Sequence, residues 1–165
     1  MTTPGWAEVA APFRRLARWV TVVQLVGYTT ALVLVWHTTR MRAGGIADRY
    51  RGVDPGLATD APMQFPKPAE EMLRITHTHL LSLLVIFLIS GATLILCERV
   101  SPRWKRFLVA EPFVAILVSF VALWGTRYVD PRFSYLMMAS SGAMAVTFYL
   151  QCALVLRELG WRDAA

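Results

Sequence analysis

The three histidines of this 165-residue chain all lie at the ends of apolar segments. His37 follows the apolar run 20–36, and His77 and His79 precede the run 80–97. Imidazole is the commonest protein ligand for metals and a common axial ligand of haem iron. Two histidines on facing helices suit the binding of b-type haem inside a membrane bundle. We therefore expect these side chains to form a cofactor site.

The spacing of the histidines limits which of them can act together. Positions two apart on a helix point about 200° apart, because each residue turns the helix by about 100°. His77 and His79 therefore cannot both face one ligand. We expect one of them to face the bundle opposite His37, and the other to face the loop, lipid or a partner. Arg127, at the end of the third apolar run, is expected to meet haem propionates.

Two other interpretations of the same residues stay open. Met41 follows His37 by four positions, which would place both on one face if the helix continued. Thioethers together with imidazoles suit Cu(I), so His37, His77, His79 and Met41 form a candidate copper set. Methionine also fills irregular packing, and histidine at a helix end can simply bond water, headgroups or loop carbonyls. The last interpretation requires no cofactor.

The elements that position these residues are long apolar helices. The chain is 56% hydrophobic, which is too apolar for an ordinary soluble domain. About 20 residues of helix cross a bilayer core of about 30 Å, and four runs approach or exceed that length without a polar stripe. The runs are 20–36, 80–97, 107–124 and 133–156. The sequence predicts an all-α fold, an integral membrane four-helix bundle.

The domain organisation follows from these runs. We expect a cytoplasmic N-terminal segment over 1–18 and a single transmembrane domain over 19–165. The extramembrane loop 38–67 is rich in glycine and proline, so we expect an irregular cap with one short helical turn. The predicted helices cover about 19–37, 68–97, 107–126 and 133–157.

The basic residues predict the orientation in the membrane. They are most concentrated before the first helix and in the short second loop, and such flanks stay in the cytoplasm. We therefore expect a multi-pass protein of the bacterial inner membrane with both termini cytoplasmic and the histidines near the periplasm. The net charge of +6 then reflects topology, and no basic and aromatic interleaving typical of nucleic-acid binding is present. The basic residues of the two cytoplasmic flanks are Arg14, Arg15, Arg18, Arg99, Arg103, Lys105 and Arg106.

Several short motifs resemble a known family. "WHTTR" ends the first run, "YRG" lies in the loop, "THTHLL" opens the second run and "LWGTR" ends the third. This pattern resembles uncharacterised bacterial four-helix inner-membrane proteins with a T-H-x-H-L signature, which are associated with cytochrome and redox systems. The resemblance implies that His37, His77 and His79 act in a redox-linked membrane setting. The chain has no C-x-x-C-H motif for covalent haem.

The leading functional hypothesis is a membrane redox or electron-transfer subunit. It would hold a b-type haem near the periplasmic face through histidines of the first two helices. Its partners would be the lipid bilayer, other membrane subunits, and a quinone or a periplasmic cytochrome. The alternatives are a cofactor-free accessory subunit of a larger membrane complex and a copper-binding membrane protein. The chain lacks a hydrolytic triad, paired carboxylates and a phosphate-binding loop, so we expect a non-catalytic subunit.

Overall fold

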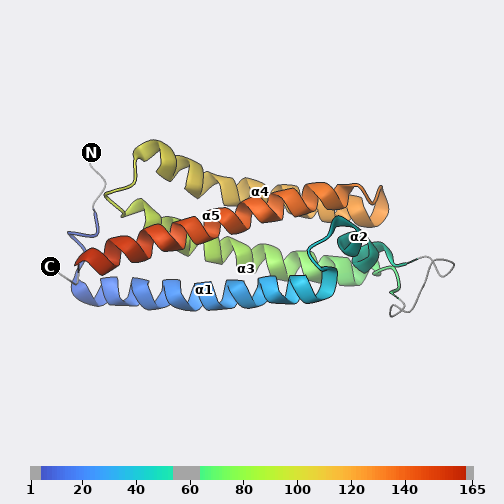
Figure 1. Ribbon diagram of the computed structural model, residues 1–165, viewed down its shortest axis with the longest axis horizontal. Coiled ribbons are helices and arrows are strands. Elements are labelled where there is room, and N and C mark those ends of the chain that lie inside the picture. Colours follow the sequence, from blue (N-terminus) through green and yellow to red (C-terminus); the bar gives the residue numbers. More distant parts are fainter. Residues whose placement is uncertain (1–4, 54–63, 163–165) are drawn as a thin grey trace.

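The structure is a computed structural model that describes residues 5–53 and 64–162, with side chains up to residue 160. Within these residues the chain forms four long helices and one short helix (Figure 1). The four long ones are long and apolar enough to cross a membrane, which confirms the predicted all-α membrane bundle. The helices are α1 (Ala11–Thr39), α2 (Ala43–Arg51), α3 (Ala69–Ile95), α4 (Pro102–Tyr128) and α5 (Phe133–Arg162).

Helix α5 lies at the centre of the arrangement. It contacts α1, α3 and α4, and its contact with α4 is the most extensive in the bundle. Small hydroxyl side chains allow this close approach, since Ser119 Oγ of α4 lies 2.7 Å from Ser140 Oγ of α5. Helix α1 lies at the edge and meets α3 only slightly.

An aromatic cluster fills the middle of the bundle. Tyr28 of α1 stacks on Phe148 of α5, with ring centroids 4.2 Å apart. Phe87 of α3 meets both rings edge-on, at 6.4 Å from Tyr28 and 6.0 Å from Phe148. Such pairs add to the stabilisation that burial of their area supplies. This cluster lies about 12 Å along α3 from His79, at the helical rise of about 1.5 Å per residue, and is therefore deeper in the bundle than the predicted cofactor site.

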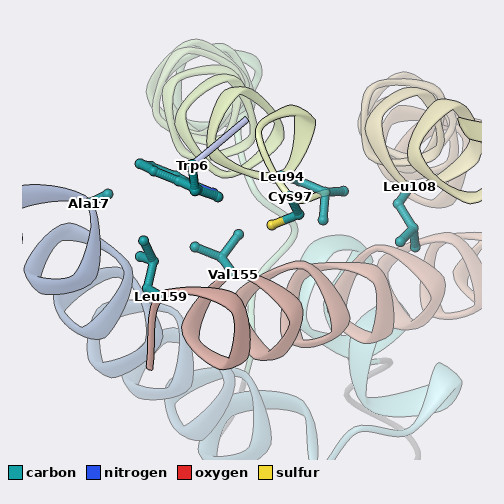
Figure 2. Packing of buried hydrophobic residues seen from close by; sticks show 7 residues of the cluster. All are labelled: Trp6, Ala17, Leu94, Cys97, Leu108, Val155 and Leu159. Atoms are coloured by element: carbon teal, nitrogen blue, oxygen red, sulfur yellow. The ribbon is translucent and has the colours of Figure 1, made fainter. Parts of the chain in front are cut away.

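The N-terminal segment covers the end of the bundle where α1 begins and α5 ends (Figure 2). Trp6 is 2% exposed, and its backbone N–H donates to Leu96 O at 3.1 Å. Its indole Nε1 donates to Thr93 O at 3.2 Å, which leaves no buried donor unpaired on that ring. The Trp6 side chain therefore fills the interior at this end of the bundle. The cluster around it comprises Ala17, Leu94, Cys97, Leu108, Val155 and Leu159.

The helices extend further than the apolar runs. Helix α1 begins at Ala11 and α4 at Pro102, earlier than the expected starts at 19 and 107. The added turns carry charges that find partners at the bundle end; Arg18 Nη2, for example, donates to Leu159 O at 2.9 Å. In the expected loop 38–67 the structure has a complete short helix, α2, and residues 54–63 lie outside the described part.

Candidate functional site

His37 lies in the last turn of α1 and points away from the bundle. It follows the buried Tyr28 by nine positions, which is two and a half helical turns and hence the opposite face. Its side chain is exposed, and its ring contacts the neighbouring Trp36 ring edge-on at 4.9 Å between centroids. The first histidine is therefore outside the bundle interior.

His77 belongs to an outward apolar stripe of α3. It lies five positions after Met72, which is fully buried, so the two side chains diverge by about 140°. His77 is exposed. The exposed leucines that share its face are Leu73, Leu81, Leu84 and Leu88.

His79 lies on the face of α3 that also carries the buried Met72, seven positions earlier, although its own side chain is exposed. Ile86, seven positions later and hence on the same face, accepts a hydrogen bond at its carbonyl from Gln24 Nε2 of α1 at 3.3 Å. His79 itself is exposed. Its Nδ1 lies 3.0 Å from Ile75 O, and because a carbonyl only accepts, Nδ1 carries the proton. The other ring nitrogen, Nε2, is then the unprotonated one in the neutral ring.

The structure does not bring His37 together with His77 or His79 across the bundle. All three side chains are exposed, and the helix faces that carry them point in different directions. Among the described residues, no group of three or more histidine, cysteine or acidic side chains could hold a metal ion. A cofactor that uses these histidines must therefore lie on the outer surface of the chain.

Arg127 holds the segment that leads into α3. Its Nε donates to Lys67 O at 2.8 Å, and its guanidinium lies over the Tyr128 ring, 4.7 Å from the centroid. Because Nε and the guanidinium face are occupied in this way, Arg127 acts in the structure as an anchor for that segment. Arg127 therefore supports the start of α3 and does not stand beside a histidine pair.

Met41 lies beyond the end of α1. The helix ends at Thr39, and Arg40 and Met41 both adopt left-handed backbone angles, with φ of 54° and 50°. These two residues turn the chain sharply into α2, so Met41 does not continue the helical face of His37. Its side chain is 46% exposed.

Two further contacts position the histidine end of the bundle. Trp124 Nε1 of α4 donates to Thr76 Oγ1 of α3 at 3.0 Å, directly before His77. Gly45 of α2 lies so close to α1 that a Cβ there would come within 2.1 Å of Thr39 O. From the sequence, the glycines at 44–45 were expected only to interrupt a helix. In the structure, the absence of a side chain at Gly45 allows α2 to pack against the end of α1.

A comparison with protein families identifies the architecture. The model of the family Aq_1264_TM, described as a transmembrane helical domain, matches residues 40–164. The chain belongs to this family. No curated protein matches the chain, and no solved structure does.

The Aq_1264_TM match includes two of the three histidines. It covers α2 to α5 and thus includes His77 and His79, whereas His37 and the rest of α1 precede it. Helix α1 is also the least buried of the four long helices, with 11% of its most apolar window buried. Membership in the Aq_1264_TM family, together with the four long apolar helices, makes this a multi-pass membrane protein.

Proposed function

We propose that this chain is a subunit of a membrane redox complex that contributes a histidine ligand to a b-type haem at its surface. The ligand would be His79, and a second polypeptide of the complex would supply the other axial ligand and cover the haem. We also propose that the protein lies in a bacterial inner membrane with both termini cytoplasmic. The histidine end would then face the periplasm, where a quinone or a periplasmic cytochrome could exchange electrons.

The hydrogen bond of His79 carries the proposal. Histidines that bind metals usually donate their second ring nitrogen to a carbonyl or carboxylate, which sets the tautomer and orients the ring. His79 donates Nδ1 to Ile75 O at 3.0 Å and is exposed, so Nε2 is available to iron from outside the bundle. Of the three histidines, only His79 makes a hydrogen bond of this type among the described residues.

The surroundings of His79 explain why a partner is required. Deeper in the bundle, the Tyr28, Phe87 and Phe148 rings fill the interior between α1 and α3, so a haem has no space at that level. On the outer surface one face of a bound haem would remain uncovered by this chain. The leucine stripe of α3 that contains His77 points about 200° away from His79, so the partner that covers the haem has to contact α3 on the side of His79 itself.

A second candidate function is the cofactor-free accessory subunit. The observation that favours it is that all three histidines are exposed and Arg127 already has a carbonyl partner. In that case His77 and His79 would be polar contacts to another subunit. Copper has less support, because Met41 lies beyond the helix that carries His37.

The test is a spectrum of the complex from its native membrane. The tagged chain is purified in mild detergent with the proteins that remain bound, and a reduced-minus-oxidised spectrum and a metal analysis are recorded on one sample. We expect a b-type haem signal that His79→Ala abolishes. His37→Ala is the matched control, since that histidine lies on the opposite side of α1, and it should keep the signal.

Each other result has a definite meaning. A haem signal that survives His79→Ala would contradict the role of His79. A colourless preparation with bound partners and no metal would overturn the redox proposal in favour of the accessory subunit. Bound copper without a haem signal would favour the copper-binding interpretation.

A further inference from the structure

We propose that the beginning of α4 is a binding site for an anionic phospholipid. An open cavity of about 300 Å³ lies there, lined by Arg103, Trp104 and Phe107. It is at the opposite end of the bundle from the histidines (Figure 1). The inference is independent of the proposed redox function, because it rests on a different set of residues.

The apolar wall of the cavity suits an acyl chain. Trp104 is 60% exposed and Phe107 55% exposed, although both are large aromatic side chains. Their rings form an edge-on pair with centroids 5.9 Å apart. Phe107 lies three residues further along α4, about 4.5 Å deeper into the bilayer, at the rise of about 1.5 Å per residue. The wall therefore runs from the interface toward the hydrocarbon, where tryptophan marks the boundary.

The charge of Arg103, next to the apolar wall, suits a phosphate. Arg103 lies in the first turn of α4, where the unpaired backbone N–H groups of the helix favour an anion. Its guanidinium makes no hydrogen bond or ion pair with any other residue that the structure describes. A guanidinium binds phosphate oxygens through two parallel N–H groups, which gives both strength and orientation. The nearby Lys105 is already engaged, since its Nζ donates to Ile95 O at 2.8 Å.

The charge of this end of the bundle selects an anionic lipid over a zwitterionic one. Basic side chains from three segments lie at this end of the bundle, and they outnumber the acidic ones among the described residues. A lipid with net negative charge gains about 1 kcal/mol for each basic residue near the surface. The basic residues besides Arg103 are Arg14, Arg15, Arg18, Arg99, Lys105, Arg106 and Arg157, and the acidic ones are Glu8, Glu98 and Glu158.

The combination of one cationic and two aromatic side chains distinguishes the binding of a phospholipid from that of a free anion. A free phosphate would use Arg103 and gain nothing from Trp104 and Phe107. A phospholipid uses all three, because its phosphate and its upper acyl chain are joined at the spacing of the interface. The two sources therefore differ in their dependence on the aromatic pair.

The experiment measures the unfolding midpoint of the detergent-purified protein while phosphatidylglycerol, phosphatidylcholine or inorganic phosphate is added. We expect phosphatidylglycerol to raise the midpoint at lower concentration than phosphatidylcholine. Arg103→Ala should weaken the apparent affinity for phosphatidylglycerol roughly fivefold. Arg132→Ala is the matched control, an exposed arginine at the start of α5 at the other end, and should leave the affinity unchanged.

A second variant keeps the test decisive. Trp104→Ala should weaken the apparent affinity for both lipids. It should leave the unfolding midpoint without lipid almost unchanged, because this side chain is mostly exposed. Equal affinity for the two lipids in the wild type, or an unchanged preference in Arg103→Ala, would overturn the proposal. Stabilisation by inorganic phosphate that equals that by phosphatidylglycerol would show a site for a free anion instead.

Discussion

Gln151 of α5 donates its amide Nε2 to the backbone carbonyl of Leu108 in α4 at 2.6 Å. Leu108 lies four residues before Pro112, which has no N–H, so the regular helical partner of that carbonyl is missing. The same Gln151 accepts a hydrogen bond at Oε1 from Ser90 Oγ of α3 at 2.6 Å. One fully buried side chain thus joins three helices and satisfies the group that the proline leaves unpaired.

Replacing Gln151 should therefore destabilise the bundle. Gln151→Leu leaves the Leu108 carbonyl buried without a partner and reduces the hydrogen bonding of Ser90 Oγ to its 3.5 Å contact with Phe87 O, which costs about 1–3 kcal/mol. Unfolding in mixed micelles with a rising fraction of sodium dodecyl sulfate measures the loss. The control is Gln24→Leu, because the Ile86 carbonyl that Gln24 contacts belongs to an uninterrupted helix. An equal effect of both substitutions would contradict the role of the proline.

Removal of the Trp6 side chain should be costly although the residue precedes every helix. Trp6→Ala empties a site that is 98% shielded from solvent, and such truncations cost about 3–5 kcal/mol. The measurement is the thermal midpoint in detergent. Trp19→Ala, at a residue 69% exposed on the outer face of α1, should change it little. A small effect at Trp6 would show that the segment does not plug the bundle.

Two glycines should respond in opposite directions to alanine. A Cβ at Gly125 would lie 2.7 Å from ring carbons of Phe133, so Gly125→Ala should destabilise by about 1–3 kcal/mol. A Cβ at Gly142 meets nothing within 4 Å, so Gly142→Ala should stabilise α5 by up to about 1 kcal/mol. The isolated chain in detergent is the sample for both unfolding measurements. Destabilisation by Gly142→Ala in that sample would contradict the open space at this position.

Glu111 should be replaceable without loss of stability. Helix α4 begins at Pro102, and Glu111 lies in its third turn. Its buried Oε2 has no hydrogen-bond partner in the described structure. Carboxylates within a membrane are costly, so Glu111→Gln should raise the free energy of unfolding by roughly 1 kcal/mol. A marked loss of stability, or of activity in the native complex, would instead reveal a role for the carboxyl group.

The sequence alone determined that the chain is a membrane bundle with four spanning helices. The reason is that bilayer thickness sets the length of an apolar run, and that requirement acts on each helix separately. It was less informative about the helix ends. Helices α1 and α4 continue into charged turns that are stabilised by contacts at the bundle end, such as that of Arg18 with Leu159 O. The apolar pattern does not record these contacts.

The tertiary structure alone decided which way the histidines point. Helical periodicity predicted that His77 and His79 diverge, but not which of them faces the core, since that depends on the rotation of α3 about its axis. Contacts between helices set this rotation, among them that of Trp124 with Thr76 and the edge-on contacts of Phe87 with Tyr28 and Phe148. In the structure these contacts leave both histidines exposed. The packing of distant side chains thus determines whether a histidine at a membrane boundary lies inside or outside the bundle.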